Sequence, residues 1–410
     1  MKIVHVTAGI QETCGVSQFV VNVAKAQQAS GYDVTIVTTM TCGYTVDDLK
    51  VVLATDPTEA LDSIVGNGER VIVHLHSMWS SYLHEAARWC RKRNAPYVIS
   101  PHGATTPWAM NYKWWKKKPA WWLYQCKDFK GAAAFHVTVP DEEEDIRRLG
   151  FSQSVVVAPL GADVNQAFQD FLTSRTSRIP LRDIVFVGRI HPVKNLVSLV
   201  RAWSILVQKK AGHHCPPIFS TCFLRLVIAG SNDVGHQEEL VELAKSLGLK
   251  VIDFSHDLEF GKKTIDGGGE VPVETFQDRL ADCDADVVFA GPVYSAAKDW
   301  MFAHAWVSVL PSHSENFGGV VVESLAQGTP VIASKGTPWQ ALETNGCGWW
   351  VDATPDKLAE ALWLALQMSM EERSDRSVKA KDLVRREFSW ESSARKVTSL
   401  YETILSSSDS

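Results

Sequence analysis

One pattern, a strand followed by a loop, a helix and a second strand, occurs twice in this chain, and the two copies begin about 180 residues apart. In the first copy, alternating apolar residues predict a strand over residues 2–7 and another over 34–37. The apolar spacing between them predicts a helix over 17–29, with Ser17 as its N-cap. Because a helix between two strands favours a parallel pair with a right-handed crossover, the fold is expected to be α/β.

The second copy begins at residue 183 with the strand DIVFV and continues with a helix predicted over 195–207. Two copies in 410 residues predict two doubly wound, Rossmann-like parallel-sheet domains. We expect an N-terminal domain over residues 1–170 and a C-terminal domain over 180–389. Open α/β sheets bind ligands at the carboxyl ends of their strands. The chemistry is therefore expected in a cleft that the two domains face.

The composition excludes several classes of protein. With 45% hydrophobic and 21% charged residues the chain is globular, and its net charge of -6 argues against a nucleic-acid partner. No apolar stretch reaches the roughly 18 residues of a membrane span, and the N-terminus is typical of a strand rather than a signal peptide. Eight cysteines without a CxxC pair predict free thiols in a reducing cytoplasm. A polar linker is expected over 165–182 and a surface insertion over 261–270.

The most informative motif lies in residues 306–334, WVSVLPSHSENFGGVVVESLAQGTPVIAS, which predict a strand, a loop, a helix over about 320–327 and a strand. Glu315 precedes the helix and Glu323 follows eight residues later, so both carboxylates are expected to face one crevice. The helix N-terminus between them favours an anion through its dipole and its unpaired N–H groups. Its backbone donors would come from Asn316, Phe317, Gly318 and Gly319. The alternative interpretation is a pair of solvated surface acids.

A second motif, GRIHPVKN, follows the strand that ends at residue 187. Its Arg189 guanidinium and Lys194 ammonium lie between a buried strand and a helix. Together they are suited to clamp a diphosphate, although two such cations are more often simply exposed to solvent.

These two motifs resemble the E-x7-E signature and the GR…K pattern of retaining GT-B glycosyltransferases, and most closely those of glycosyltransferase family 4 from bacterial polysaccharide and lipopolysaccharide synthesis. The resemblance implies a GT-B fold in which Glu315 lies by the donor sugar and Glu323 holds the ribose. It also implies that Arg189 and Lys194 neutralise the leaving diphosphate without a metal ion. Asn316 stands where the family often has Gly.

Three further positions follow from the same resemblance. Gly15, in the loop after the first strand, is expected to approach the donor phosphate, and Gly291 is expected beside the base. His102, in the segment SPHG, is expected near the transferred sugar as a substrate-binding or catalytic residue. A C-terminal helix over about 390–410 is expected to pack back onto the N-terminal domain.

Other histidines suggest a metal only weakly. His74 and His76 share one face of a strand, and no third ligand of matching spacing is evident, so they are interpreted as part of an acceptor-side loop. A zinc site in the polar insertion is a minor alternative, with the ligands His213, His214, Cys215 and Cys222. We therefore predict no metal and no cofactor besides the donor substrate.

The segment 107–130, PWAMNYKWWKKKPAWWLYQCKDFK, concentrates tryptophan and lysine. Trp and Tyr favour membrane interfaces and lysines favour anionic head groups, which predicts a peripheral contact with the inner face of a membrane. The equal alternative places Trp121, Trp122 and Leu123 in the core of a helix.

The predicted function is the transfer of a sugar from a nucleoside-diphosphate sugar to an acceptor hydroxyl with retention of configuration. The expected partners are a nucleotide sugar and a glycan or lipid-linked acceptor. Two alternatives are an epimerase or phosphorylase of the same fold and a non-catalytic subunit that binds nucleotide sugars. The base, the sugar and the acceptor do not follow from these motifs.

Overall fold

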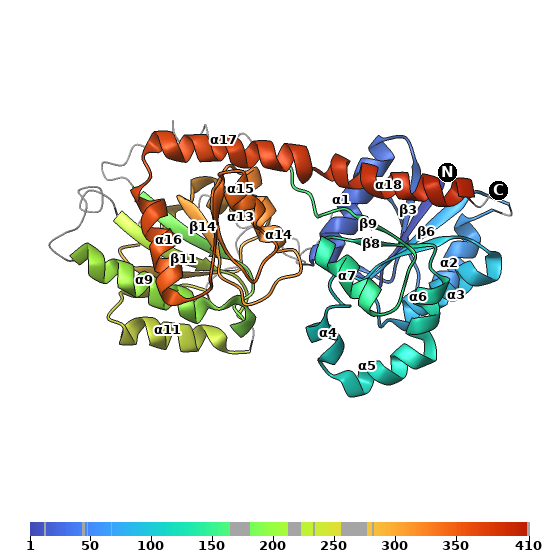
Figure 1. The fold of residues 1–410 in the computed structure, drawn as a ribbon, viewed down its shortest axis with the longest axis horizontal. Coiled ribbons are helices and arrows are strands. Elements are labelled where there is room, and N and C mark those ends of the chain that lie inside the picture. The colour runs from blue at the N-terminus through green and yellow to red at the C-terminus, as the bar shows by residue number, and fades with distance from the viewer. Residues whose placement is uncertain are drawn as a thin grey trace. The chain divides into compact units, whose positions relative to one another are not determined.

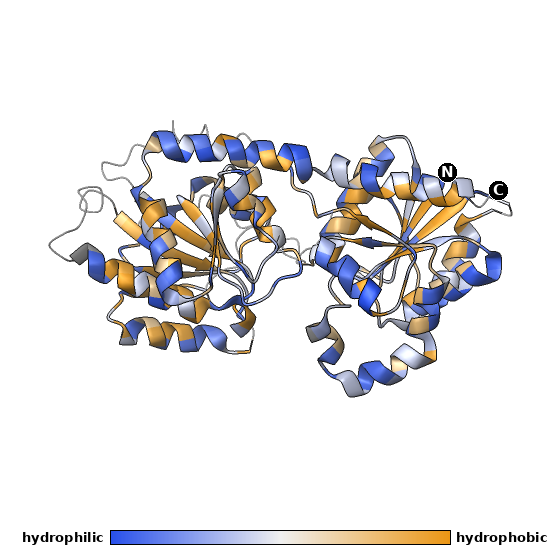
Figure 2. Ribbon diagram, viewed as in Figure 1, coloured by the Kyte–Doolittle hydropathy of each residue, from blue (hydrophilic) through white to orange (hydrophobic). Residues whose placement is uncertain are grey.

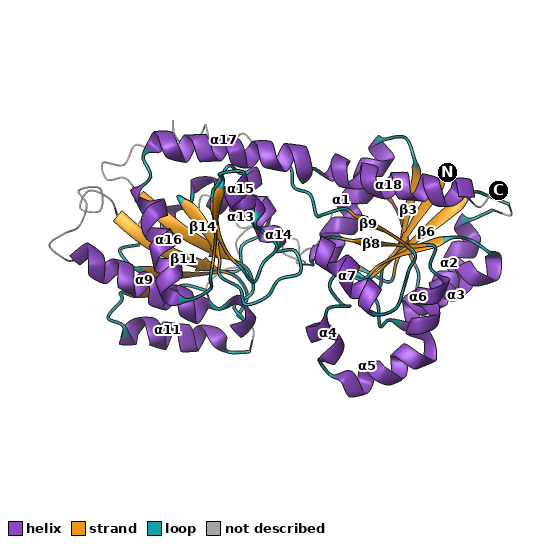
Figure 3. Ribbon diagram, in the orientation of Figure 1, coloured by secondary structure: helices purple, strands orange, loops and turns teal. Residues whose placement is uncertain are grey.

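The computed structural model describes residues 1–407 except 12–13, 43–45, 47, 67, 165–180, 212–222, 233, 256–276 and 281–282. The chain forms two compact units. Unit 1 contains Met1–Gly161 together with Phe388–Ser410, and unit 2 contains Ala162–Glu387. Figure 1 colours the chain by residue number, and Figure 3 shows that strands in each unit are flanked by helices.

Unit 1 is built on a parallel seven-stranded sheet with the order β5-β3-β1-β6-β7-β8-β9. The chain therefore leaves β1 in one direction and returns to β6 on its other side, which places a topological switch point between these two strands. The elements are β1 Lys2–Val6, β2 Ile10–Gln11, α1 Gly15–Ala29, β3 Asp33–Thr38, β4 Thr41–Cys42, β5 Lys50–Leu53, α2 Pro57–Ile64, β6 Val71–His76, α3 Ser81–Arg93, β7 Tyr97–Ser100, α4 Pro107–Asn111, α5 Trp114–Ala120, the π-helical η1 Trp121–Gln125, α6 Cys126–Gly131, β8 Ala134–Val137, α7 Pro140–Arg148, β9 Ser154–Val157 and α18 Trp390–Ser407.

Each face of this sheet has its own core, because alternate strand residues point to opposite sides. On one face, Val73 and Ile99 pack with α2, α3 and α6. On the other, Ile72 and Val98 pack with α1 and α18. The strands are correspondingly hydrophobic in Figure 2, whereas many exposed helix positions are hydrophilic. Helix α18 thus completes a core that begins with the first strand of the chain.

Unit 2 contains a second parallel seven-stranded sheet, with the order β12-β13-β11-β10-β14-β15-β16. Its switch point lies between β10 and β14. The elements are β10 Leu181–Val187, the 3-10 turn η2 Pro192–Lys194, α9 Leu196–Ala211, β11 Phe223–Ala229, α11 His236–Ser246, β12 Val251–Asp253, β13 Val287–Gly291, α13 Ser295–His304, β14 Val307–Leu310, α14 Gly319–Ala326, β15 Val331–Ser334, α15 Ala341–Thr344, β16 Gly348–Val351, α16 Pro355–Gln367 and α17 Met370–Glu387.

Two details differ from the sequence prediction. Helix α1 begins at Gly15 with Cys14 at the N-cap, so the expected capping by Ser17 is wrong; its hydroxyl accepts a hydrogen bond from Gln11 N at 3.0 Å. The second strand pattern starts earlier than expected, since Leu181 and Arg182 already belong to β10 rather than to a linker. The rest of that linker, the insertion 261–270 and the four metal candidates of the other insertion lie outside the described residues.

Among the described helices, none combines the length and the apolar character that a membrane-spanning helix needs. Cys14, Cys90, Cys126 and Cys347 are free thiols.

Candidate functional site

An ion pair lies at the switch point of unit 2. Lys194 ends the turn that follows β10, and its ammonium contacts the Glu315 carboxylate in the loop after β14. Both side chains are largely buried, with exposed fractions of 15% and 13%. The Ser312 hydroxyl donates a further hydrogen bond of 2.6 Å to the same Glu315 oxygen. The structure thus brings together two residues that lie 121 positions apart in the sequence and that were both predicted as catalytic.

The two loops that carry this pair are fastened to each other. Asn195 adopts a left-handed conformation with φ of 54°, which turns the chain from η2 into α9. Its buried amide donates to Pro311 O at 3.2 Å and to Ala353 O at 2.9 Å. His313 N donates to Val193 O at 2.8 Å. The sequence analysis did not identify Asn195 as a site residue. The signal that could have found it is an asparagine directly after Lys194, since asparagine favours the left-handed conformation of a turn.

The N-terminus of α14 has the conformation that the predicted anion site requires. Gly318 is the N-cap, with φ of 77°, and Gly319 begins the helix. Phe317 is buried, and its carbonyl accepts a 2.6 Å hydrogen bond from the indole of Trp339. Asn316 is partly exposed in the same loop. Because the first N–H groups of a helix have no partner within it, this end favours an anionic ligand.

Glu323 lies on α14 and forms an ion pair with Lys298 of α13, with 2.8 Å between Nζ and Oε1. Next to Lys298, Asp299 is mostly buried, and this burial, with the charge of Glu323 acting the same way, raises the Asp299 pKa to about 6. The neighbouring Lys298 opposes that shift. Sequence reasoning missed Lys298 and Asp299, because no spacing rule links α13 to α14.

The remaining predicted residues of unit 2 also follow strands. Arg189 is exposed in the turn after β10, and Gly291 ends β13 with φ of 75°. Beneath Arg189 the backbone is tightly packed, since a Cβ at Gly230 would lie 1.7 Å from Gly188 O. Strands β13, β11, β10 and β14 are parallel neighbours in this order, so their carboxyl ends lie along one edge of the sheet.

In unit 1, three residues in left-handed conformation follow adjacent strands: Ser77 and Trp79 after β6, and His102 after β7, with φ of 81°, 68° and 51°. Such conformations cost about 1–3 kcal/mol each and often mark functional sites. Gly15 is exposed at the start of α1, and a Cβ there would meet no atom within 4 Å. Burial, and to a smaller extent His136, lower the pKa of His102 to about 3, so this ring is neutral at physiological pH.

Glu142, a buried residue of α7, holds the loop of His102 in place. Its carboxylate accepts hydrogen bonds from Gly103 N, from Thr138 N at 2.7 Å and from the Thr138 hydroxyl at 2.8 Å. It was also missed from the sequence, where the run DEEED after residue 140 resembles an ordinary acidic helix start.

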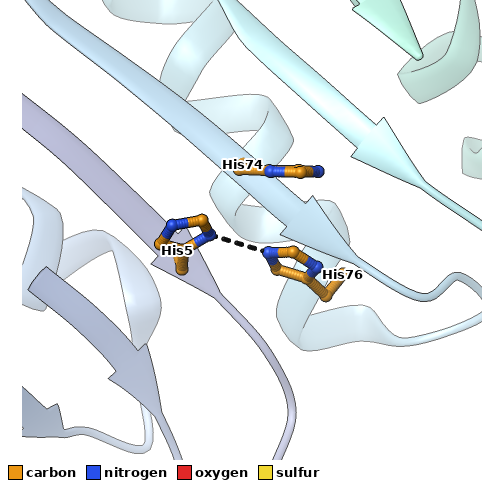
Figure 4. A group of neighbouring side chains, drawn as sticks. All are labelled: His5, His74 and His76. Carbon is orange, nitrogen blue, oxygen red and sulfur yellow. Dashed lines mark hydrogen bonds between the residues drawn. The ribbon is translucent and has the colours of Figure 1, made fainter. Parts of the chain in front are cut away.

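The structure corrects the interpretation of His74 and His76. A third histidine is present: His5 of β1 lies opposite His74 in the sheet register, and ligand atoms of the three rings lie within 4.8 Å of one another. Figure 4 shows the three imidazoles and the 2.9 Å contact between His5 Nδ1 and His76 Nε2. Spacing along one strand could not reveal this neighbour, which comes from a different strand.

Comparison with solved structures defines the class of the fold. Sucrose-phosphate synthase from Thermosynechococcus elongatus superposes with a TM-score of 0.64 and 18% identity, over 99% of this chain and 100% of that one. Anabaena HepE in complex with UDP superposes with a TM-score of 0.66 and 14% identity, over 98% of this chain and 100% of that one. The two parallel α/β sheets are those of a GT-B fold.

Two family models match the sequence. The model described as Glycosyltransferase Family 4 matches residues 13–166, and the model described as Glycosyl transferases group 1 matches residues 267–383. The two halves of the chain are thus similar to glycosyltransferases of family 4 and group 1, and the chain has the GT-B fold.

The curated relatives match this chain over only about half of their own length. The D-inositol 3-phosphate glycosyltransferase of Corynebacterium kroppenstedtii is 28% identical over 263 residues, which cover 60% of this chain and 47% of that protein. An uncharacterized glycosyltransferase of Methanocaldococcus jannaschii is 26% identical over 252 residues, 60% of this chain and 52% of that protein. The chain thus spans about half the length of these relatives.

Proposed function

We propose that this protein is a retaining glycosyltransferase that moves a sugar from a nucleoside-diphosphate sugar to an acceptor hydroxyl. The observation that carries the proposal is the contact between Lys194 and Glu315 at the switch point of unit 2, beside the open N-terminus of α14. The matches to the two glycosyltransferase family models and the UDP complex of Anabaena HepE support a nucleotide-sugar donor.

In this proposal the donor diphosphate binds where positive charge is preorganised. Lys194, Arg189 and the N–H groups after Gly318 stabilise the charge that develops on the departing diphosphate. Glu315 orients the Lys194 ammonium through their contact. Its carboxylate also orients the sugar hydroxyls. Glu323 binds the ribose hydroxyls, with Lys298 holding its carboxylate in place.

Retention of configuration is proposed to follow a same-face displacement, in which the departing phosphate helps to deprotonate the acceptor. His102 is neutral, so its contribution is a hydrogen bond to the sugar rather than a positive charge. We also propose that the reaction requires no metal ion, since the two cations and the helix N-terminus supply the positive charge. Transfer that stops on addition of EDTA would contradict this part.

The proposed acceptor is a glycan or a lipid-linked glycan at the cytoplasmic face of a membrane. Several large apolar side chains of the segment 107–130 are exposed: Tyr112, Trp114, Trp115, Trp122 and Leu123. Trp122 and Leu123 are therefore not core residues, whereas Trp121 packs against Trp79, Phe129 and Phe151. Figure 1 places α4 and α5 at the periphery of unit 1. Lys113, Lys116 and Lys118 are exposed beside these aromatic side chains, which suits an anionic lipid surface.

The catalytic proposal is tested by incubating the chain with UDP-, GDP-, ADP- and dTDP-sugars and following hydrolysis, transfer and thermal shift. We expect one nucleotide sugar to stabilise the fold and Lys194→Ala to lower its turnover about 100-fold or more. Lys335→Ala is the control, because Lys335 also forms an ion pair in unit 2 but is half exposed. If neither variant loses activity, the proposed diphosphate clamp is rejected. Interconversion of the sugar without transfer would indicate an epimerase. The anomeric configuration of the product, read by NMR, tests retention.

The membrane proposal is tested by co-sedimentation with vesicles that contain anionic lipid. We expect binding at low salt that weakens as salt is added, and that falls when Trp115, Trp122 and Leu123 are replaced by Ser. The control is Leu364→Ser, since Leu364 is another exposed large apolar residue and lies in unit 2. Absence of binding to anionic vesicles at low salt would reject the contact.

A further inference from the structure

Five histidines of unit 1 lie in one row across its sheet, on the face that α1 and α18 cover. His5 comes from β1, His74 and His76 from β6, and His136 from β8, while His102 follows β7. Except for the partly exposed His102 residue they are fully buried, and burial lowers the pKa of each ring. Each ring is therefore neutral near pH 7, with one nitrogen that donates a hydrogen bond and one that accepts.

The direction of the hydrogen bonds can be followed from a fixed end. His136 Nε2 lies 2.8 Å from the carbonyl oxygen of Ala158, and a carbonyl can only accept. His136 is therefore protonated at Nε2 and accepts at Nδ1, where the Ser100 hydroxyl donates at 2.6 Å. The Ser100 oxygen in turn accepts from His74 Nε2 at 2.5 Å. His74 Nδ1 is thus the acceptor of the Tyr401 hydroxyl.

A second series of hydrogen bonds starts at Gln27 of α1 and leads to the switch point. The Gln27 amide nitrogen donates to Thr398 Oγ1 at 3.4 Å. The Gln27 oxygen then faces His5 and accepts from its Nε2 at 2.7 Å. His5 Nδ1 is left as the acceptor for His76 Nε2 at 2.9 Å, the bond drawn in Figure 4.

The last step reaches the proposed sugar site. His76 donates through Nε2, so its Nδ1 must accept, and the group 3.2 Å away is Nε2 of His102. We propose that His76, His5 and Gln27 are positioning residues that fix His102 as the Nε2–H tautomer, so that its Nδ1 accepts a hydrogen bond from a hydroxyl of the substrate. The role of Nδ1 rests on the function proposed above, whereas the tautomer does not.

A metal ion bound by His5, His74 and His76 is the competing interpretation, because their ligand atoms lie within 4.8 Å of one another. However, His5 Nδ1 and His76 Nε2 contact each other, and both nitrogens of His74 already bond to Tyr401 and Ser100. A metal ion would have to replace several of these buried hydrogen bonds. The hydrogen-bonded row is therefore favoured, and metal binding is one outcome of the test.

The test is ¹⁵N NMR of the full chain labelled at histidine, in which two-bond correlations distinguish a protonated from an unprotonated ring nitrogen. The His102 signals are assigned by their loss in His102→Gln. At pH 7 we expect His102 to be protonated at Nε2 and unprotonated at Nδ1. A His102 ring protonated at Nδ1, or a stoichiometric metal in the purified chain whose removal shifts the His5 and His76 signals, would overturn the proposal.

A variant pair tests the origin of the tautomer. Gln27→Met keeps the shape of the side chain but removes the amide that gives the row its direction, so His102 should become a mixture of both tautomers. Thr398→Val is the matched control, since Thr398 contacts the same amide but lies outside the row. An unchanged His102 spectrum in a folded Gln27→Met would contradict the proposal. If Gln27→Met does not fold, two variants of His76 replace it in the test. His76→Asn retains an acceptor near the position of Nδ1, whereas His76→Leu does not. Equal His102 spectra in these two variants would contradict the proposal.

The rate of sugar transfer provides a second readout. With the donor found in the nucleotide-sugar panel, kcat should fall in proportion to the remaining Nε2–H fraction of His102, while Thr398→Val keeps its rate. A mixed tautomer with full kcat would show that Nδ1 does not act in transfer. If the wild-type chain transfers no sugar but shows the expected tautomer, the proposed function fails and the hydrogen-bonded row stands.

Discussion

At the scale of single residues, the sequence motifs named most of the charged groups but not their partners. Glu315 and Lys194 were identified because each stands in a local pattern. Their contact, and that of Glu323 with Lys298, depends on which strands and helices become neighbours. His5 illustrates the same limit, since its place beside His76 follows from the order of the strands in the sheet and not from any spacing.

Asp299 makes the stability of the protein depend on pH. Its pKa is about 6 in the folded chain and 3.8 as an unperturbed group, so the folded state binds the proton more tightly. The free energy of unfolding should therefore decrease as the pH rises from about 4 to about 6, and then level off. Asp299→Asn should remove this slope and stabilise the chain at pH 8 by up to about 3 kcal/mol, as measured by denaturant unfolding. The exposed Asp284→Asn is the control, and identical slopes in both variants would contradict the assignment.

Glu142 should matter for the loop of His102. Glu142→Ala leaves the buried N–H of Thr138 and the partly buried N–H of Gly103 without their acceptor, at a cost of about 1–3 kcal/mol for a buried group. We expect a lower melting temperature and a lower transfer rate. Glu144→Ala, an exposed position on the same helix, should change neither quantity. Equal melting temperatures would show that the loop does not depend on this carboxylate.

At the scale of elements, periodicity located the βαβ units well, whereas the helix ends were less predictable. Ser17 has the residue type of an N-cap, but the helix starts two residues earlier because the loop after β1 uses its hydroxyl instead. The segment 107–130 breaks into α4, α5, η1 and α6, which no simple period predicts. By contrast, the strand, loop, helix and strand around Glu315 follow the predicted pattern, since Gly318 and Gly328 mark the two ends of α14.

Gly318 should be required for the N-terminus of α14. Gly318→Ala places a side chain at φ of 77° and a Cβ 3.0 Å from Leu310 Cδ2. The left-handed conformation alone costs about 1–2 kcal/mol, so we expect a lower melting temperature together with weaker donor binding by calorimetry. Gly66→Ala, whose Cβ meets only ordinary contacts, should be close to neutral. Donor affinity that is unchanged in Gly318→Ala would exclude this helix end from the phosphate site.

At the scale of the whole molecule, the sequence predicted the number and class of the sheets, because each βαβ pattern begins a new one. The composition contributed little to this result, and it could not show which tryptophans are exposed. The membership of Phe388–Ser410 in unit 1 is a property of the complete fold. Trp390, Val397 and Tyr401 fill the core between α18, α1 and the sheet.

Removal of residues 388–410 should therefore unfold unit 1 selectively. It uncovers an apolar core and interrupts the histidine row at Tyr401. Limited proteolysis with mass spectrometry should show rapid cleavage within residues 1–161 and resistance of strands β10–β16. Removal of only 408–410 is the control. Equal resistance of both units after the longer truncation would mean that α18 adds little stability.

The return of the chain to unit 1 also determines when that unit can be completed during translation. The ribosome must synthesise Ala162–Glu387 before the residues of α18 emerge. At about 5–20 residues per second this takes roughly 10–45 s. During that interval the sheet face with His74 and His136 lacks its final helix, so the nascent chain presents an apolar surface to chaperones until its last segment arrives.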